Sequence, residues 1–254
     1  MAIHRTEAFV LKTQPLRSSS LIVTFFTPGF GKMKGVAKGV RREKELRGAL
    51  YELFTRLEIV FYEKTRSDLH LISDAAIVDS NDGLRRRFDT ITYASYFCEM
   101  VDVLTVVHDR HEPVFDLLDF VFRYLRSIPG SQLTLVFKLK LLNEVGWLPY
   151  LAGCFHCRKV QFEEGFFSVS QGALLCPACG RNYTDARSIS GEALGALRYY
   201  GNHQPEDCIR RRLTPSVEGE LTVWLSEFLD FRLPIPLKTT QFIEAVRPVL
   251  SDLA

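Results

Sequence analysis

Four cysteines constrain the fold of this chain more than any other sequence feature. Cys154, Cys157, Cys176 and Cys179 form the pattern Cys-x2-Cys-x18-Cys-x2-Cys, a spacing typical of structural zinc ribbons. Each pair places two thiolates at the tip of a tight turn, and the residues between the pairs can fold as a hairpin that brings both tips to one ion. We therefore predict one structural zinc ion bound by these four residues.

The residues around the motif favour a structural role for the metal. Pro177 and Gly180 suit a tight cysteine turn, and we expect nearby apolar side chains to cover the site: Phe162, Phe166, Phe167 and Val169. His156 lies between two of the cysteines, but four thiolates complete a tetrahedral set, so we expect His156 to be exposed. Two free cysteine pairs or a redox dithiol are the alternative. Cys98 lies on the apolar face of a predicted helix, which indicates a buried thiol rather than a nucleophile.

The composition is that of a globular protein with a sizeable core. Of the 254 residues, 46% are hydrophobic and 24% are charged, which excludes a disordered chain, collagen and a coiled coil. No apolar run reaches the length that a bilayer span needs, and the polar N-terminus lacks the order of a secretory signal. We therefore expect a cytoplasmic protein with no membrane partner, in which cysteine pairs bind metal rather than form disulfides.

Residues 6–79 have the pattern of short β-strands separated by turn signals. Five strands are predicted, at Glu7–Thr13, Leu21–Thr27, Lys32–Val40, Phe54–Tyr62 and Leu69–Val78. This number of short strands fits a small closed barrel, of which the OB-fold is the commonest architecture, with an SH3-like barrel as the alternative.

After Asn81 the apolar residues recur at helical spacing. Helices are predicted over Tyr93–Leu104, Phe115–Leu125, Leu133–Val145, Ser190–Tyr200 and Pro215–Phe231. Neither half has enough apolar faces to form a bundle alone, so we expect the last two helices to return to the first ones. The predicted class is α+β, with four parts: an N-terminal OB-fold β-barrel that binds nucleic acid (1–80), the first part of a helical domain (81–150), an inserted four-cysteine zinc ribbon (151–185) and the second part of the helical domain (186–254).

Positive charge is concentrated in one segment. Residues 1–80 hold 13 basic and 9 acidic side chains. One run contains seven basic residues opposed only by Glu43 and Glu45: Lys32, Lys34, Lys38, Arg41, Arg42, Lys44 and Arg47. The three lysines share parity on a predicted strand, so we expect them to face outward together while Met33, Gly35 and Ala37 face the other side.

Such a row of cations on a barrel is the electrostatic track that a nucleic-acid backbone needs, and a solvated face is the alternative. Nearby aromatic residues either stack on bases or are buried: Phe26, Phe30, Tyr51 and Phe54. Two shorter basic clusters, 85–87 and 210–212, either extend this path or form exposed turns.

The sequence shows no catalytic constellation. A phosphate-binding loop is excluded because Met33 follows Gly31-Lys32 where Ser or Thr is required. The His-x-Glu element of a deaminase, a nucleophile elbow and a carboxylate pair are also missing. We therefore expect a binding protein rather than an enzyme. A second hypothesis is a zinc-ribbon adaptor that binds only other proteins, and a metal-dependent nucleic-acid enzyme is a third.

Several stretches give the chain a family resemblance. They are Val10-Leu11-Lys12, Leu21-Ile22-Val23, the barrel stretch 31–42, Tyr96–Asp102, the helical stretch 137–142 and Gly146-Trp147-Leu148-Pro149, which leads into the first cysteine pair. In these stretches the chain resembles RecO, a family of bacterial recombination mediators. One departure is that Glu43 and Glu45 flank Lys44 where many relatives place Lys with serines.

The resemblance implies an OB-fold, a helical domain and a zinc-bearing module without enzymatic turnover. It further implies binding to single- and double-stranded DNA, annealing of complementary strands, contacts with RecR and with the tail of single-stranded-DNA-binding protein, and help in loading RecA during recombinational repair. A nucleoid-associated location in the cytoplasm follows. By motif position, DNA contact carries over to Lys32, Lys34, Lys38, Arg41 and Arg42.

Overall fold

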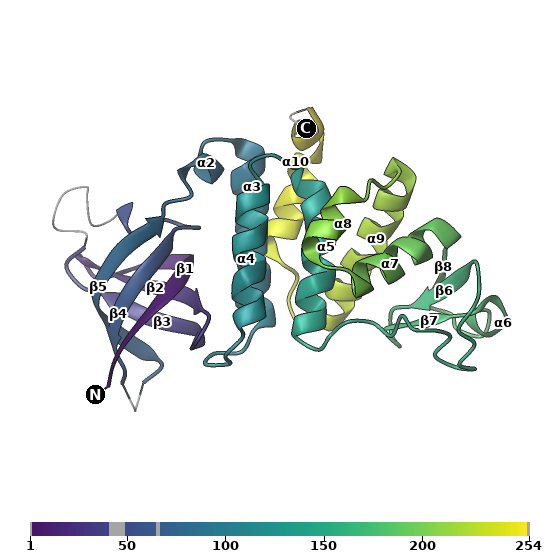
Figure 1. Ribbon diagram of the computed structural model, residues 1–254, viewed down its shortest axis with the longest axis horizontal. Coiled ribbons are helices and arrows are strands. Elements are labelled where there is room, and N and C mark those ends of the chain that lie inside the picture. The colour runs from purple at the N-terminus through teal and green to yellow at the C-terminus, as the bar shows by residue number, and fades with distance from the viewer. Residues whose placement is uncertain (1, 41–48, 65–66, 253–254) are drawn as a thin grey trace. The chain divides into compact units, whose positions relative to one another are not determined.

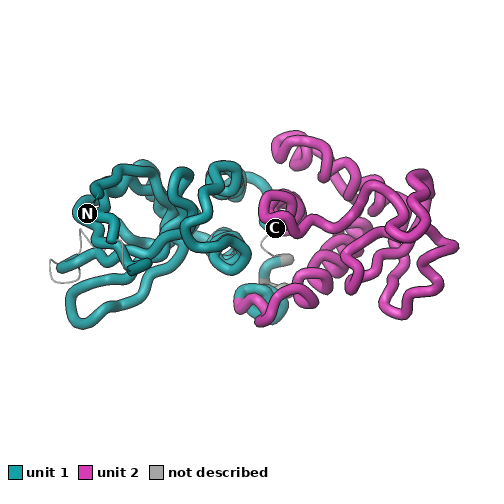
Figure 2. The backbone as a smooth tube through the Cα atoms, turned by 90° about the horizontal axis from the view of Figure 1, so that it is seen from below, with its two compact units in different colours: residues 1–130, 239–254 teal, residues 131–238 magenta. Residues whose placement is uncertain are grey.

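The computed structural model describes residues 2–40, 49–64 and 67–252. The chain divides into two compact units, residues 1–130 with 239–254, and residues 131–238 (Figure 2). In these described ranges no helix combines the length and apolar character needed to cross a membrane.

Five strands of unit 1 close into a barrel (Figure 1). They are β1 (Ile3–Leu16), β2 (Ser20–Thr27), β3 (Gly31–Ala37), β4 (Arg56–Tyr62) and β5 (Leu69–Asp79). Their order is β1-β2-β3-β5-β4, with β4 paired back to β1. The β3–β5 pair is parallel and the other pairs are antiparallel. This order is OB-like, so the predicted OB-type barrel is confirmed.

Side chains that alternate along the strands point inward and fill the barrel. Val23, Phe25, Met33 and Ala37 belong to its buried core, together with Leu57, Ile59 and Phe61 of β4. Gly35 lies between Met33 and Ala37, and a Cβ there would come within 2.4 Å of the Ile72 side chain. The predicted inward face of β3 is therefore confirmed, and the even-numbered residues of β3 lie on its other side.

Unit 1 also contains helices that pack beside the barrel. They are α2 (Asp82–Arg85), α3 (Phe88–Leu104), α4 (Glu112–Tyr124) and, from Thr239 onward, α10 (Lys238–Asp252). The Phe9 ring of β1 contacts Phe115 and Phe122 of α4, with centroid distances of 4.8 and 5.3 Å. The Thr239 backbone N–H donates to the Glu99 carboxylate of α3 at 2.8 Å. The predicted α3 and α4 are confirmed, whereas α10 was not predicted.

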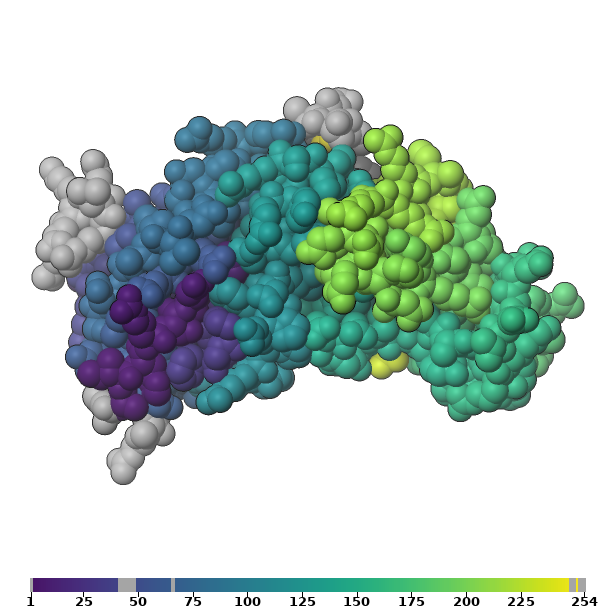
Figure 3. All heavy atoms as spheres, in the orientation of Figure 1, coloured from purple at the N-terminus to yellow at the C-terminus, as the bar shows by residue number. Residues whose placement is uncertain are grey.

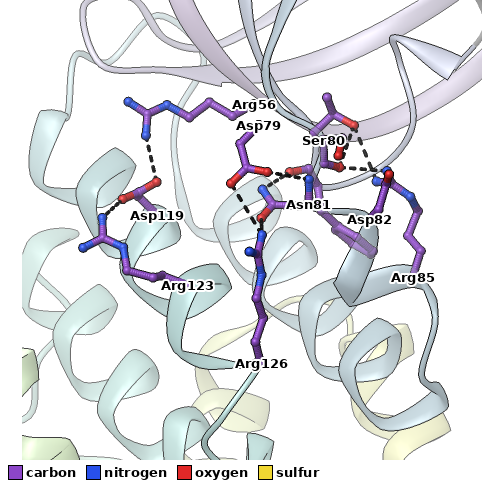
Figure 4. A network of polar contacts seen from close by, with 11 residues as sticks. Arg56, Asp79, Ser80, Asn81, Asp82, Arg85, Asp119, Arg123 and Arg126 are labelled. Carbon is purple, nitrogen blue, oxygen red and sulfur yellow. Dashed lines mark hydrogen bonds and ion pairs between the residues drawn. The ribbon is translucent and has the colours of Figure 1, made fainter.

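A polar network joins the barrel to these helices (Figure 4). Asn81 has a φ of 52°; its side-chain N–H donates to Phe54 O at 2.9 Å, and its Oδ1 accepts from Arg126 at 2.6 Å. Arg85 donates to the carbonyls of Leu53 and Ser80, at 2.7 Å each. These bonds satisfy backbone groups at the junction, so Arg85 in the basic cluster 85–87 has a structural role.

Unit 2 combines helices with a small three-stranded sheet. Its elements are α5 (Gly130–Glu144), β6 (Gly165–Ser168), β7 (Ala173–Leu175), α6 (Pro177–Gly180), β8 (Ala186–Ile189), α7 (Gly191–Asn202), α8 (Pro205–Arg210) and α9 (Pro215–Arg232), with the sheet order β7-β6-β8. Ser190 caps the N-terminus of helix α7, because its hydroxyl accepts from Ala193 N at 3.2 Å. Lys140 of α5 donates to Tyr200 O of α7 at 2.6 Å. Lys138 of α5 also donates to the Ser226 hydroxyl of α9 at 3.2 Å. The last two predicted helices therefore contact α5, the third of the predicted first helices, whereas the other two, α3 and α4, belong to unit 1.

Candidate metal centre and nucleic-acid interface

The four motif cysteines meet in unit 2. Their sulfur atoms all lie within 4.8 Å of one another, and Cys157 Sγ is 3.7 Å from Cys176 Sγ. The second pair occupies the start of α6, where Cys176 O accepts from the N–H groups of Cys179 at 3.1 Å and Gly180 at 2.9 Å. The cluster is a four-thiol set that can hold one metal ion.

The segment between the pairs folds as the predicted hairpin. Strands β6 and β7 are antiparallel, and Phe162 and Phe166 pack on the buried cluster of Cys154, Leu175 and Cys176. A Cβ at Gly180 would lie 2.5 Å from the Phe166 ring, which explains the glycine there. Successive side chains of β6 point to opposite faces of the sheet, so Phe167 points away from the cysteines, contrary to the prediction. Its ring contacts that of Trp224, with centroids 3.9 Å apart.

The thiols of the cluster differ in acidity. Burial favours the neutral thiol of Cys154, but hydrogen bonds from the backbone of Cys157 and Cys176 and from the Cys157 side chain outweigh it and lower the Cys154 pKa to about 6. At Cys179, burial and the neighbouring cysteine side chains raise the pKa to about 12. The Cys154 thiolate therefore forms readily, and its charge opposes the ionisation of Cys179 until a cation balances it.

His156 and the two remaining cysteines of the chain, Cys98 and Cys208, take no part in the cluster. His156 is exposed, as predicted, and its Nδ1 lies 3.4 Å from the Tyr183 hydroxyl. Cys98 is buried in α3, where burial raises its pKa far above the usual range. Cys208 is also buried, with its thiol 3.7 Å from His203 O. Neither Cys98 nor Cys208 has the exposure and low pKa of a reactive thiol.

The predicted basic strand is only partly exposed. Lys34 and Lys38 are exposed as predicted, and among the described residues no carboxylate forms an ion pair with either of them. The cations Arg41, Arg42, Lys44 and Arg47 lie outside the described residues. In the part of the run that the structure describes, Lys34 and Lys38 are therefore the cations that face solvent.

The prediction that Lys32 faces outward with them is wrong. Its side chain is only 8% exposed, and its ammonium donates to Asp102 O and lies 3.5 Å from Asp102 Oδ1. The chain after α3 covers this end of β3: His108 N donates to Lys32 O at 2.9 Å, and a Cβ at Gly31 would overlap Asp109 O. Contacts with α3 and the following loop thus place Lys32 beneath a cover that strand parity does not reveal.

Lys12 extends the exposed basic face and was not predicted as a site residue. Val10 belongs to the barrel core and pairs with Phe25, but a β-bulge follows, and Lys12 pairs with Thr24. Thr24 in turn pairs with Lys34. Residues directly opposite each other point to the same side of a sheet, so Lys12, Thr24 and Lys34 lie in one row on the outer side of the barrel. Thr24 is only 6% exposed, so Lys12 and Lys34 are the exposed members of this row. We name Lys12, Lys34 and Lys38 the outer basic face.

The aromatic residues near the basic run belong to the core. Phe26 and Phe54 are fully buried and Tyr51 is 5% exposed. Phe30 is partly buried, and its ring contacts Phe61, with centroids 5.2 Å apart. The alternative of burial is therefore the correct one for Phe26, Tyr51 and Phe54, while Phe30 is partly buried.

Comparisons with known proteins identify relatives over almost the whole length. Residues 1–81 match the family model described as Recombination protein O N terminal, and residues 85–241 match Recombination protein O C terminal. A DNA repair protein RecO of Syntrophus aciditrophicus is 29% identical over 254 residues, covering 97% of each chain. One of Symbiobacterium thermophilum is 30% identical, covering 97% of this chain and 99% of the relative. A DNA repair protein RecO of Halalkalibacterium halodurans is 26% identical, covering 95% of this chain and 94% of the relative.

Proposed function

Because the chain belongs to the RecO family of DNA repair proteins, we propose that it binds single- and double-stranded DNA on the outer basic face and anneals complementary strands. The observation that carries the proposal is the row Lys12–Thr24–Lys34, with the exposed Lys38 directly after the end of β3. Lys12 and Lys34 are two strands apart, a separation of about 10 Å. Lysines at this spacing can contact successive parts of one backbone or the backbones of two strands.

Annealing follows from charge neutralisation. Two complementary strands repel each other through their phosphates, and a cationic face that holds both lowers this repulsion while it leaves the bases free to pair. The protein binds both strands without breaking a covalent bond, so the role is that of a mediator and not of an enzyme. Arg41, Arg42, Lys44 and Arg47 contribute further positive charge to the same function.

The partners of this activity are other recombination proteins. In the proposed role the protein acts with RecR, contacts the tail of single-stranded-DNA-binding protein and helps to load RecA on the coated strand. Such a role belongs at the nucleoid in the cytoplasm. The family membership supports these contacts.

The metal in this proposal is one structural zinc ion held by Cys154, Cys157, Cys176 and Cys179. Zinc–thiolate bonds of about 2.3 Å in a tetrahedron place neighbouring sulfurs about 3.8 Å apart, and the 3.7 Å separation of the Cys157 and Cys176 sulfurs fits this geometry. Four thiolates leave no open position for substrate, so zinc would hold the two cysteine turns together. Metal binding of this kind stabilises small domains by about 10–16 kcal/mol.

Strand annealing tests the proposal. Two complementary oligonucleotides, one carrying a donor and the other an acceptor dye, are coated with the cognate single-stranded-DNA-binding protein and mixed with the purified full chain. We expect energy transfer to develop faster with the protein than without it, and more slowly with a Lys12→Gln/Lys34→Gln/Lys38→Gln variant.

Two outcomes would contradict the proposal. If the wild-type chain leaves the annealing rate unchanged, the activity is wrong. If the triple variant anneals as fast as the wild type, the activity stands but the outer basic face does not carry it. Arg5→Gln is the matched control, because Arg5 lies on β1 of the same barrel but forms an ion pair with Glu58.

A further inference from the structure

Three large aromatic side chains are exposed close together in the sequence, at and before the first cysteine pair. Trp147, Tyr150 and Phe155 are 39%, 38% and 37% exposed. They precede or belong to the segment 150–185, which forms a surface lobe of unit 2 (Figure 3). Neither the barrel nor the metal centre explains why aromatic rings are exposed here.

Hydrogen bonds to strand β7 and the turn before it fix the backbone of two of these residues. Tyr150 N donates to Gly172 O at 2.9 Å, and Tyr150 O accepts from Leu174 N at 3.1 Å. Phe155 N donates to Leu174 O at 2.8 Å. The two rings lie 6.2 Å apart between centroids, in an edge-to-face arrangement. The rings are thus presented by a hydrogen-bonded scaffold and not by a free loop.

An arginine joins the two rings. The Arg158 guanidinium carbon lies 5.5 Å from the Tyr150 ring centroid and 5.6 Å from that of Phe155. Its backbone is set by the cysteine turn, since Arg158 N donates to Cys154 O at 2.9 Å and its φ is 64°. Because the guanidinium already rests near both rings, less side-chain freedom is lost when it binds an anion.

Two further cations lie beside this group. Lys159 follows Arg158 and is exposed. Arg232 is exposed and lies against Gly172: a Cβ at Gly172 would be 2.6 Å from Arg232 Nη2. Gly172 O is also the acceptor for Tyr150 N. Within the described ranges, no carboxylate forms an ion pair with Arg158, Lys159 or Arg232. The group therefore combines exposed rings with unneutralised positive charge.

We propose that this group, the knuckle stacking surface of Tyr150, Phe155 and Arg158, binds unpaired bases of single-stranded nucleic acid. The inference rests on the proposed function and adds a second contact to it. Proteins that bind single strands combine cations along the backbone with aromatic rings on which bases stack. The barrel supplies the exposed cations Lys12, Lys34 and Lys38, but its aromatic residues Phe26, Tyr51 and Phe54 are buried. The knuckle stacking surface supplies partly exposed rings with the Arg158 guanidinium beside them.

A protein partner is the competing occupant, because aromatic residues and arginine are also enriched in protein interfaces. The charge favours nucleic acid: an apolar peptide would leave Arg158, Lys159 and Arg232 without counter-charge, whereas phosphates beside a stacked base would neutralise them. A stacked base also keeps its pairing edge free, which is what strand annealing requires.

The test uses the full chain and a fifteen-nucleotide strand of thymidines with one central 2-aminopurine, whose fluorescence falls when it stacks on an aromatic ring. We expect quenching on binding to the wild type. In Tyr150→Ala/Phe155→Ala we expect the quenching to disappear and affinity to fall by about fivefold or more, the effect of losing one stacked base. Tyr150→Phe should keep both, because the ring remains.

Phe231→Ala is the matched control, since Phe231 lies on α9 of the same unit and is 59% exposed. It should bind and quench as the wild type does. A second measurement needs no substitution: a strand carrying 5-iodouracil is irradiated with the wild-type chain, and the crosslinked peptides are identified. We expect crosslinks to residues 147–158.

The outcomes separate this inference from the proposed function. If the wild type binds the strand but Tyr150→Ala/Phe155→Ala quenches equally, or if crosslinks occur only in barrel peptides, the knuckle stacking surface does not bind bases. If Tyr150→Ala/Phe155→Ala no longer retains a protein partner that the wild type retains, but quenches as the wild type does, the surface binds protein and the inference is overturned. If the wild type does not bind the strand at all, the proposed function fails together with it. The Lys12→Gln/Lys34→Gln/Lys38→Gln variant should bind more weakly yet still quench at saturation.

Discussion

Replacing Lys12, Lys34 and Lys38 by glutamine should flatten the salt dependence of single-strand binding. Each phosphate that a lysine neutralises releases bound counterions, which lowers the slope of log K against log salt by about 0.7 for single strands. Lys32 is excluded from the sum because Asp102 already balances its charge. Three contacts therefore contribute about 2 units of slope.

This difference in slope is large enough to measure. Between about 50 and about 200 mM salt, roughly a fourfold change, a slope difference of about 2 means that the wild type loses about 16-fold more affinity than the triple variant. Fluorescence anisotropy of a labelled thymidine strand, titrated with protein at several salt concentrations, gives both slopes. Arg5→Gln removes a positive charge from the same barrel and should retain the wild-type slope.

The result that refutes the reasoning is a triple variant with an unchanged slope. The three lysines would then lie away from the phosphates, whatever the total affinity. The circular dichroism spectrum of the variant must match that of the wild type, which confirms that the comparison is between two folded proteins.

Three further predictions concern the metal, the pH dependence and the junction of the barrel. Elemental analysis should find one zinc ion per chain and substantially less in Cys157→Ser, which should also unfold at a lower temperature; equal unfolding temperatures of the metal-loaded and chelated wild type would contradict a structural role. Burial and the neighbouring His108 lower the pKa of His70, so the unfolded chain takes up this proton more readily and the free energy of unfolding should fall as the pH drops below about 6.5. In chemical denaturation, the free energy of unfolding of His70→Gln should fall less steeply with decreasing pH than that of the wild type. If the two pH profiles are identical, His70 does not cause this effect. Asn81→Gly keeps the positive φ but loses the bonds to Phe54 O and Arg126, so we expect a cost of about 1–3 kcal/mol in urea unfolding, and a wild-type midpoint would speak against the network.

Local patterns in the sequence predicted the barrel and the metal cluster well. Five strands and two of the unit 1 helices depend on alternation and helical spacing within short windows, and the cysteine set depends on ligand spacing alone. Each of these signals is local, so it survives without knowledge of which element packs against which.

The basic face was harder to predict because its exposure depends on tertiary contacts. Strand parity correctly separates Lys34 from Met33, but it cannot show that α3 and residues 105–109 cover Lys32. Lys12 was not predicted because of a local irregularity in its strand. A bulge after Val10 reverses the side to which later residues of β1 point, and strict alternation does not reveal a bulge.

Helix α10 and the division into units also lay beyond the sequence patterns. Phe242, Val246 and Leu250 have helical spacing, but Pro248 argues against a continuous helix in this window. The return of residues 239–254 to unit 1 involves the bond from Thr239 to Glu99, across 140 positions of the chain. Such long-range pairing has no local sequence signal.

Acetylation footprinting of lysines tests the central claim most directly, because it reports which cations DNA covers in the unaltered protein. The chain is treated with a lysine-acetylating reagent, with and without a saturating single strand, and the modified peptides are quantified by mass spectrometry. We predict that DNA protects Lys12, Lys34 and Lys38, that Lys32 reacts slowly in both samples, and that Lys64 reacts equally in both. Equal reactivity of Lys12, Lys34 and Lys38 with and without DNA would contradict the claim that the outer basic face of the barrel binds DNA.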